Sequence, residues 1–236
     1  MSADDPKRAV GEAAAELVQS GMIVGLGSGT TAAWFVRALA ELRLDIRGVP
    51  TSQATAALAR ELGLALMDLD DALEIDLTID GADEIGPGLS LIKGGGAALL
   101  REKLVWEAST RCVTIADASK VVQTLGGFPL PIEVVAFGHA TTLRRITGGL
   151  ADCGIIAAPR LRRKDGAVVV TDSGNLIYDA ACGAILDPVG VEAALKSITG
   201  VVEHGLFLGL TKEALIGTSL GVERLGPRDF KELPNG

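Results

Sequence analysis

The sequence predicts an α/β fold in which a mostly parallel sheet carries helices on both faces and is joined to a smaller α+β domain. Short apolar runs alternate with amphipathic runs over the first half of the 236-residue chain, which is typical of parallel strands linked by helices. Hydrophobic residues make up 48% of the chain but aromatic residues only 3%, so small aliphatic side chains must fill the core. The length fits one large domain with a small companion.

The larger domain is expected to be Rossmann-like and to begin with a helix at residues 7–20, where apolar side chains recur at helical spacing. The strands that follow are expected at residues 22–27, 46–50, 65–67, 75–79 and 112–116, and the helices at residues 31–42, 53–62 and 97–108. The strand at 75–79 alternates apolar and polar residues, which predicts that one of its faces is less fully covered.

The smaller domain is expected to be ferredoxin-like, because its elements follow the order strand, helix, hairpin, helix, strand. Pro129 and Pro131 mark its beginning, so the expected domains are residues 1–128 with 206–236, and residues 129–205. The expected elements are strands at 132–136, 167–171, 176–178 and 201–208 and helices at 139–148 and 191–198, with the hairpin turn at 172–175. Residues 214–217 and 222–225 are expected to return to the first sheet.

The charge and the termini exclude several classes of protein. A net charge of −8 is unlike that of a general nucleic-acid-binding protein, which needs a basic face. Neither a signal peptide nor an apolar run of membrane length is seen, so we expect a cytoplasmic protein without a membrane partner. Cys112, Cys153 and Cys182 are odd in number and lack metal-binding spacing, which indicates reduced, buried thiols.

A glycine-rich turn at residues 25–31 follows the first strand and opens a helix. Backbone N–H groups at a helix N-terminus, together with the hydroxyls of Ser28, Thr30 and Thr31 around Gly29, can hold a phosphate. A dinucleotide-binding turn needs a third glycine where Thr30 stands, so a phosphorylated small molecule fits better. A tight turn with a Ser or Thr N-cap is the structural alternative.

Three acidic residues crowd the end of the strand at 75–79. Asp80, Asp83 and Glu84 lie within five residues and repel one another unless a cation or a substrate is near. Acid–base chemistry fits better than metal binding, because histidine is scarce and no spaced ligand set is present. The alternative is a pair of loop aspartates that cap turns.

Lys93 precedes a glycine triplet, and Glu102 lies on the helix that follows. Gly94, Gly95 and Gly96 allow a close approach of the backbone to a ligand, and Lys93 can stabilise an oxyanion. Glu102 has apolar neighbours three and four residues away on both sides, and burial there favours a general base. A solvated lysine and a boundary glutamate paired with a cation are the alternatives.

These residues together resemble the type A family of ribose-5-phosphate isomerases. Asp80-Gly-Ala-Asp-Glu-Ile85 and Lys93-Gly-Gly-Gly-Ala-Ala98 are the most specific matches. The other matching segments, in family order, are 25–31, 51–52, 101–103, 116–120, 128–134 and 171–175. Leu91, Leu100 and Ser173 depart from the family pattern but remove no side chain with an expected role.

The resemblance implies an aldose–ketose isomerase that interconverts D-ribose 5-phosphate and D-ribulose 5-phosphate through a cis-enediolate, without a metal or a cofactor. Glu102 is implied as the proton-transfer base, Asp80 as the residue that assists ring opening, and Asp83 as a ligand of the sugar hydroxyls. Lys93 and the amides of residues 94–96 are implied to stabilise the enediolate.

The resemblance also implies a phosphate site and an oligomer. The phosphate is expected at Ser28, Gly29, Thr30 and Thr31, with the charges of Lys7 and Lys120 nearby. A homodimer or homotetramer is expected, with the smaller domain as its interface.

Two other functions remain open at this point. A sugar-phosphate sensor needs the phosphate turn but neither Glu102 nor Lys93, and it usually carries a DNA-binding segment, of which none is seen before Gly21. A Rossmann-type dehydrogenase is disfavoured by Thr30.

Overall fold

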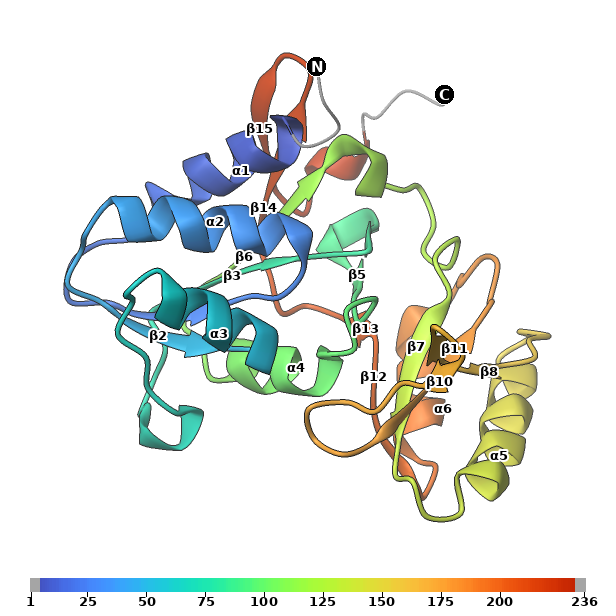
Figure 1. Ribbon diagram of the computed structural model, residues 1–236. Helices are drawn as coiled ribbons and strands as arrows, with labels where there is room; N and C mark the ends of the chain where they lie inside the picture. Colours follow the sequence, from blue (N-terminus) through green and yellow to red (C-terminus); the bar gives the residue numbers. More distant parts are fainter. Residues whose placement is uncertain (1–4, 232–236) are drawn as a thin grey trace. The chain divides into compact units, whose positions relative to one another are not determined.

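The computed structural model describes residues 5–231, and the chain forms two compact units (Figure 1). Unit 1 comprises residues 1–82, 101–121 and 209–236, and unit 2 comprises residues 83–100 and 122–208. Within the described residues, no helix is long and apolar enough to cross a membrane.

Unit 1 is built around a six-stranded sheet in the order β15-β14-β6-β3-β1-β2. Its strands are β1 (Ile23–Leu26), β2 (Arg47–Pro50), β3 (Leu77–Gly81), β6 (Cys112–Asp117), β14 (Glu213–Thr218) and β15 (Gly221–Leu225). All neighbours pair in parallel except β14 and β15. The chain therefore returns to the first sheet after unit 2, as the sequence predicts.

The helices of unit 1 cover both faces of this sheet. They are α1 (Asp5–Ala15), α2 (Thr30–Glu41), α3 (Gln53–Glu61) and α4 (Leu99–Glu107), with short 3-10 turns η1 (Leu69–Asp71), η3 (Ala118–Lys120) and η4 (Asp229–Lys231). Helices α1 and α2 lie side by side on one face (Figure 1). Helix α4 begins with two residues of unit 2 and continues in unit 1.

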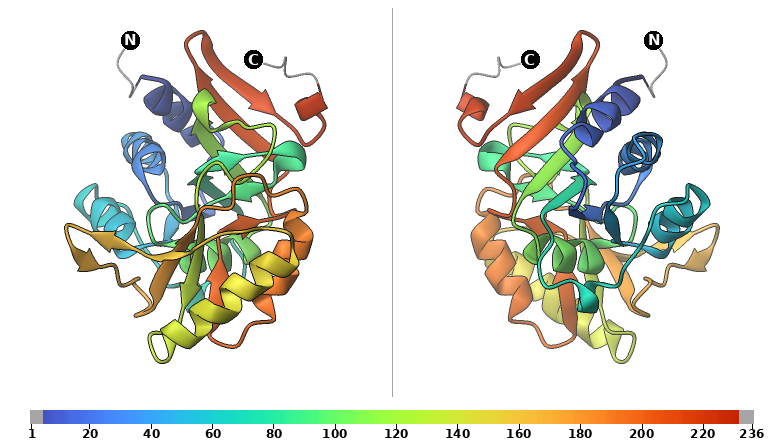
Figure 2. Two further views of the ribbon diagram at one scale, coloured as in Figure 1. Left: turned by 90° about the vertical axis from the view of Figure 1, so that its right-hand side faces the viewer. Right: turned by 90° about the vertical axis from the view of Figure 1, so that its left-hand side faces the viewer.

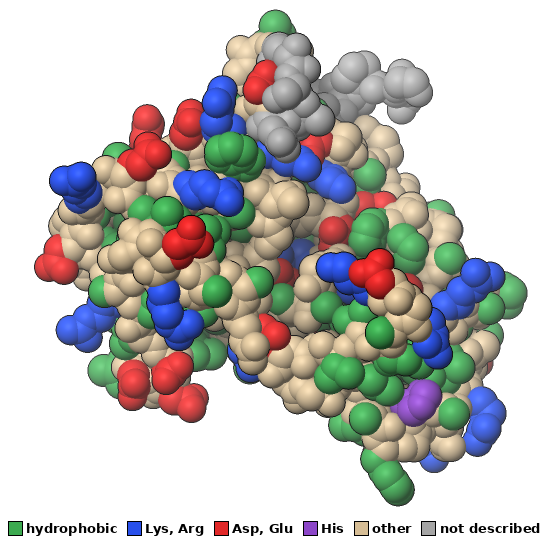
Figure 3. Space-filling model, viewed as in Figure 1, with side chains coloured by type: hydrophobic (Ala, Val, Ile, Leu, Met, Phe, Trp, Pro, Cys, Tyr) green, Lys and Arg blue, Asp and Glu red, His purple; other side chains and the backbone are tan. Residues whose placement is uncertain are grey.

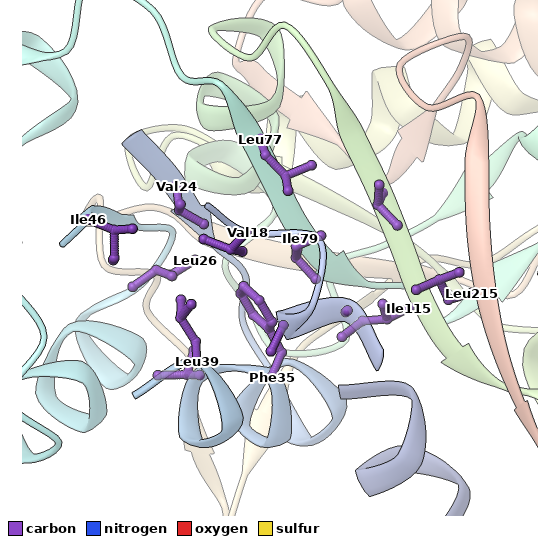
Figure 4. Close-up of a cluster of buried hydrophobic side chains, with 14 of the residues drawn as sticks. Val18, Val24, Leu26, Phe35, Leu39, Ile46, Leu77, Ile79, Ile115 and Leu215 are labelled. Carbon is purple, nitrogen blue, oxygen red and sulfur yellow. The ribbon is translucent and has the colours of Figure 1, made fainter. Parts of the chain in front are cut away.

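The main core of unit 1 lies between the sheet and helices α1 and α2. Val24, Leu26 and Ile79 project from β1 and β3 toward Phe35 and Leu39 of α2 (Figure 4). All five side chains are buried, and burying each one stabilises the fold by roughly 1.5–3 kcal/mol.

Helix α4 packs on the opposite face. Gly25 lies between Val24 and Leu26 in β1, so a side chain there would project away from the main core. A Cβ atom on Gly25 would lie 1.8 Å from Thr78 Oγ1 and 2.8 Å from Val105 Cγ1 of α4. This glycine therefore allows α4 to approach the sheet.

The structure corrects the prediction for the strand at 75–79. Strand β3 lies between β1 and β6, and four of its five residues are buried, so neither face is poorly covered. Thr78 is buried because its hydroxyl shares a 2.7 Å hydrogen bond with Ser109. The strand also extends to Gly81, which places Asp80 inside it.

Two further predictions for unit 1 are wrong. Helix α1 ends at Ala15 instead of residue 20, because Leu17 and Val18 donate to carbonyls three residues back, which tightens and ends the helix. Residues 65–67 form no strand and contribute only an isolated bridge between Leu66 and Gly48.

Unit 2 contains a four-stranded antiparallel sheet in the order β12-β7-β11-β8. Its strands are β7 (Leu130–Val134), β8 (Arg160–Leu161), β11 (Leu176–Ala180) and β12 (Val201–His204), and its helices are α5 (His139–Asp152) and α6 (Pro188–Lys196). Numbered along the chain, the strand order is 4-1-3-2, which confirms the ferredoxin-like prediction. Helices α5 and α6 lie beside one another, drawn in yellow and orange in Figure 2.

Short strands complete unit 2, and β4 (Glu84–Ile85) and β5 (Leu91–Ile92) among them were not predicted. A three-stranded sheet joins β4 (Glu84–Ile85), β5 (Leu91–Ile92) and β13 (Leu206–Phe207), with the 3-10 turn η2 (Pro87–Leu89) between β4 and β5. The predicted strand at 201–208 is thus divided at Gly205, where a Cβ atom would lie 2.3 Å from the carbonyl oxygen of Lys93.

The predicted hairpin around residues 172–175 is reduced to an isolated bridge between Val170 and Leu176. Strand β10 (Ala167–Val168) pairs with β9 (Arg163–Lys164), and β11 pairs with β7 and β8. Side-chain bonds within the turn, described below, take the place of a strand ladder.

The units divide the chain at other points than the expected domains. Residues 83–100 and 122–128 fall in unit 2 because β5 pairs with β13 and because Leu125 packs with the core of the four-stranded sheet. Residues 206–208 fall there for the same reason.

Candidate active site

Four parallel strands of unit 1 end at one edge of the sheet. Ser28 follows β1, Thr51 and Ser52 follow β2, Asp80 lies at the end of β3 and Asp117 ends β6. The hydroxyl of Ser28 lies 2.7 Å from those of both Thr51 and Ser52. Parallel pairing therefore brings together residues that are 23 and 24 positions apart.

The hydroxyls at this edge already bond to one another. Thr51 donates to the carbonyl of Leu26 at 3.1 Å, and Thr55 donates to the carbonyl of Gly27 at 2.9 Å. Each hydroxyl carries one proton, and the Ser28 proton goes to Ser52. A phosphate at Ser28 must compete with this bond, so the cluster mainly fixes the shape of the turn.

The N-terminus of α2 has the geometry of an anion site. Its N-cap, Gly29, has φ 93° and ψ −179°, a conformation that is essentially restricted to glycine. No side chain caps the helix, so the N–H groups of its first turn are not taken by a capping side chain. Thr30 is exposed and Thr31 is half-buried at this helix start.

Lys7 and Lys120 lie in separate elements, α1 and η3, that both contact β14. Lys7 follows Pro6 in α1, and a Cβ atom on Gly217 would lie 2.2 Å from the carbonyl oxygen of Pro6. Gly217 pairs with Asp117, which caps the turn η3 that contains Lys120. The two half-buried lysines thus flank the β6–β14 end of the same sheet edge.

Asp80 is fully buried and its carboxylate accepts three N–H groups. Oδ1 accepts from the backbone of Ser28 at 3.0 Å and of Gly81 at 2.7 Å, and Oδ2 accepts from the indole of Trp106 at 3.3 Å. A Cβ atom on Gly27 would lie 2.3 Å from Oδ1, so only glycine allows this approach. Asp80 therefore joins the phosphate turn, β3 and α4.

Glu102 is buried on the apolar side of α4, as predicted. Its side chain is 4% exposed, and Val105 and Trp106, one turn further along, are 2% and 1% exposed. Trp106 also donates a hydrogen bond to Asp80, so α4 holds Glu102 in register with β3. Trp34 is half-buried, and its ring centroid lies 5.3 Å from the Arg37 guanidinium.

Asp83, Lys93 and the glycine triplet lie in unit 2. The backbone N–H of Gly95 donates to Oδ2 of Asp83 at 2.8 Å. Lys93 is only 2% exposed, and its Nζ lies 5.4 Å from the ring centroid of Phe207. The alternative of a solvated lysine is therefore wrong. Gly96 is exposed, and its N–H has no hydrogen-bond partner among residues 5–231.

The crowded acids have separate partners. Glu84, the third of them, accepts the backbone N–H groups of Gly126 at 2.7 Å and of Phe128. Backbone amides therefore offset the repulsion for which the sequence suggested a cation or a substrate. The tertiary contacts that give each acidic residue its own partner leave no signal in the local sequence.

A buried carboxylate that the sequence analysis missed joins two of the family segments. Oε1 of Glu133, on β7, accepts hydrogen bonds from the hydroxyl of Thr171 at 2.9 Å and the amide of Asn175 at 3.0 Å. Thr171 also accepts from the backbone of Asn175, which closes the turn at 171–175. This network secures the turn to the four-stranded sheet.

A cavity of about 630 Å³ in unit 1 lies beside β2 and α3. Ser52, Arg60 and Arg101 line it together with Asp68 and Asp70. The acidic side chains that gather over η1 are visible at the lower left of Figure 3. Because both acidic and basic side chains line this cavity, it is a poorer anion site than the uncapped start of α2.

The described residues contain no group of three or more His, Cys, Asp or Glu side chains that could hold a metal ion.

The chain is similar to known proteins over nearly its whole length. The family model of ribose 5-phosphate isomerase A (phosphoriboisomerase A) matches residues 47–221. Ribose-5-phosphate isomerase A of Caulobacter sp. (strain K31) is 68% identical over 227 residues, which are 96% of this chain and 100% of the relative.

Solved structures show the same fold. Ribose 5-phosphate isomerase from Plasmodium falciparum superposes with a TM-score of 0.90 at 36% identity, over 95% of this chain and 99% of that one. A D-ribose-5-phosphate isomerase in complex with phospho-erythronic acid gives 0.88 at 35% identity, over 96% and 100%. The chain belongs to the ribose 5-phosphate isomerase A family, whose activity is the interconversion of D-ribose 5-phosphate and D-ribulose 5-phosphate.

Proposed function

We propose that this isomerase transfers the proton between C2 and C1 of its substrate with the carboxylate of Glu102. The observation that carries the proposal is a carboxylate that is 4% exposed on α4, one turn before the Trp106 that binds Asp80. Glu102 takes the C2 proton, the C–H electron pair forms the C1–C2 double bond, and the C1=O π electrons move onto O1, which gives a cis-enediolate. The O2 proton then moves to O1, the C2 carbonyl forms, and the proton held by Glu102 is delivered to C1. A low-exposure site limits proton loss to water during this transfer.

Lys93 and the glycine loop stabilise the negative charge of the enediolate. A buried ammonium acts in a medium of lower dielectric than water, so its attraction to a developing oxyanion is strong. The N–H of Gly96 is a second donor, while that of Gly95 holds Asp83. Asp83 accepts hydrogen bonds from the sugar hydroxyls. Asp80 moves the proton between the ring oxygen and O1 when the ring opens.

The phosphate binds at the start of α2. The uncapped amides of Thr30 and Thr31 and the helix dipole attract an anion, and Lys7 and Lys120 add positive charge to a chain of net charge −8. The solved relative in complex with phospho-erythronic acid supports a phosphorylated, sugar-derived ligand.

Turnover of ribose 5-phosphate by the purified protein tests the role of Glu102. We expect Glu102→Gln to lower kcat by about 10²–10⁴-fold. Glu107→Gln, an exposed carboxylate on the same helix, is the matched control and should retain normal activity. A Glu102→Gln enzyme with nearly normal kcat contradicts the assignment.

We also propose a cytoplasmic homodimer or homotetramer. Unit 2 exposes apolar side chains, among them Phe137 at 94%, Ile156 at 90% and Leu186 at 86%, which is typical of an association surface. Light scattering should give a multiple of the 24.3 kDa chain mass, and Phe137→Asp should lower it. Leu73→Asp, at an exposed site of unit 1, is the control. A single wild-type species at the chain mass contradicts the proposed oligomer. Cell fractionation tests the proposed cytoplasmic location.

A further inference from the structure

Arg162 and Asp179 form an ion pair in unit 2 that none of the matching family segments contains. Arg162 lies between β8 and β9, and its side chain is 13% exposed. Its Nε and Nη2 donate to the two carboxylate oxygens of Asp179 on β11, which is a bidentate arrangement. The backbone of Arg162 also donates to Ile177 at 2.8 Å, so both ends of the residue are fixed.

The remaining nitrogen of the guanidinium reaches the glycine loop. Nη1 of Arg162 donates to the carbonyl oxygen of Gly94 at 2.7 Å and to that of Gly95 at 3.2 Å. The Gly94 carbonyl also accepts the N–H of Ala97 at 3.0 Å, and one oxygen has two lone pairs for these two donors. A single side chain thus binds two successive peptide groups.

These bonds set the direction of the loop amides. In a trans peptide, the carbonyl and the next N–H point in opposite directions. With the Gly94 carbonyl directed at Arg162, the N–H of Gly95 points away from it and reaches Oδ2 of Asp83 at 2.8 Å. The Gly95 carbonyl likewise turns the N–H of Gly96 away from Arg162.

The loop depends on outside contacts to keep this conformation. Gly94 has φ 108°, and three successive glycines have no side chains that can pack. Without the guanidinium, the peptide groups at Gly94 and Gly95 can rotate. A displacement of about 1 Å at reacting groups costs up to about 10²-fold in rate.

We propose that Arg162, locked by Asp179, is a positioning residue for the isomerisation. It holds the peptide groups of Gly94 and Gly95 so that Asp83 stays bound to the Gly95 amide and the Gly96 amide faces the reacting oxygens. This inference rests on the proposed role of the glycine loop. It implies that Arg162 holds the loop and Asp83 together in one arrangement.

The kinetic constants of Arg162 variants test the proposal. We expect Arg162→Gln to lower kcat by about 10–10²-fold with little change in KM, because the phosphate site lies on other elements. Arg162→Lys should not restore kcat, since one ammonium cannot bind both carboxylate oxygens and two carbonyls. Asp179→Asn should show a smaller loss in the same direction.

The adjacent Arg163 provides the matched control. Arg163 is exposed, and its Nη1 donates only to the Gly166 carbonyl of its own turn at 2.9 Å. Arg163→Gln should therefore leave kcat and KM unchanged. Thermal unfolding of each variant measures the fraction of enzyme that is folded at the assay temperature. If Arg162 has a purely structural role, its replacement lowers this fraction and leaves the kcat of the folded enzyme unchanged. If Arg162 positions the loop, the kcat of the folded enzyme itself falls.

Two results overturn the inference. One is a folded Arg162→Gln enzyme whose kcat is within about twofold of wild type. The other is a loss of kcat that follows the folded fraction alone, in both Arg162→Gln and Asp179→Asn. Either result leaves the proposed function intact if Glu102→Gln is inactive, whereas an active Glu102→Gln enzyme overturns that function whatever Arg162 does.

Discussion

The indole Nε1 of Trp106 lies 3.3 Å from Oδ2 of Asp80 and donates a hydrogen bond to it. Trp106 follows Glu102 by one turn of α4, and Asp80 accepts the Ser28 amide of the phosphate turn. One aspartate thus connects the helix of the proposed base with the turn of the proposed phosphate site. This bond predicts that catalysis depends on an indole that never needs to touch the substrate.

Trp106→Phe removes this donor and keeps an aromatic ring in the core. We expect a loss of about 1–3 kcal/mol in the free energy of unfolding, together with a lower kcat, because a buried carboxylate loses one of its hydrogen-bond donors. Trp34→Phe on half-buried α2 is the control for replacing a tryptophan, and it should keep normal kcat. Steady-state kinetics and urea unfolding measure the two effects, and a normal kcat in Trp106→Phe would exclude the link.

Gly29→Ala tests the phosphate turn. Nothing lies within 4 Å of a Cβ atom at Gly29, so the substitution causes backbone strain of about 1–3 kcal/mol without a clash. The strain should displace the first amides of α2 and raise KM for ribose 5-phosphate. Gly63→Ala, with φ 77° and the same open space, should cost stability but leave KM unchanged. Equal effects of both variants on KM would argue against a phosphate at α2.

Lys93→Met tests charge stabilisation at nearly constant side-chain length. Loss of one oxyanion-stabilising group costs about 10²–10³-fold in kcat, and KM should change less. The apolar methionine suits the position beside Phe207, which is 2% exposed. Steady-state kinetics at saturating substrate measure kcat. A decrease in kcat of less than tenfold would contradict the role of the ammonium.

Glu133 should make stability depend on pH. Burial raises the pKa of its carboxyl above the usual 4.5, hydrogen bonds from Asn175, Thr171 and the Leu100 backbone oppose this, and Glu203 opposite on β12 adds to it. The native state therefore holds the proton more tightly than the unfolded chain. Between pH 4.5 and the raised pKa, unfolding releases a proton, so the free energy of unfolding falls as pH rises.

Glu133→Gln removes this titration and keeps an oxygen for Thr171 and Asn175. The stability of wild type relative to the variant should be greatest below pH 4.5 and should decline as pH rises through the window. Urea unfolding between pH 4 and pH 8 measures the difference, with Glu61→Gln on exposed α3 as the control. A difference that grows with pH would mean that the carboxylate is stabilised by its surroundings.

The sequence determined the elements whose signal is local. Short, largely apolar runs gave β1, β2 and β6, and the order of strands and helices gave both folds, because these patterns reflect which side chains can be buried on a sheet or a helix face. The apolar neighbours of Glu102 predicted its burial for the same reason.

Only the tertiary structure decided which partners each polar group has. The chain does not show that Asp80 binds an indole, that Lys93 lies beside Phe207, or that Arg162 holds Gly94, since each partner is 26 to 114 positions away and depends on how strands pair. A strand of two residues leaves no periodicity in the sequence, so β4 and β5 were not predicted. The polar side chain of Thr78 predicts an exposed position, but in the structure its hydroxyl shares a hydrogen bond with Ser109 and is buried. Burial can be predicted from composition and spacing, but hydrogen-bond partners are set by the three-dimensional path of the chain.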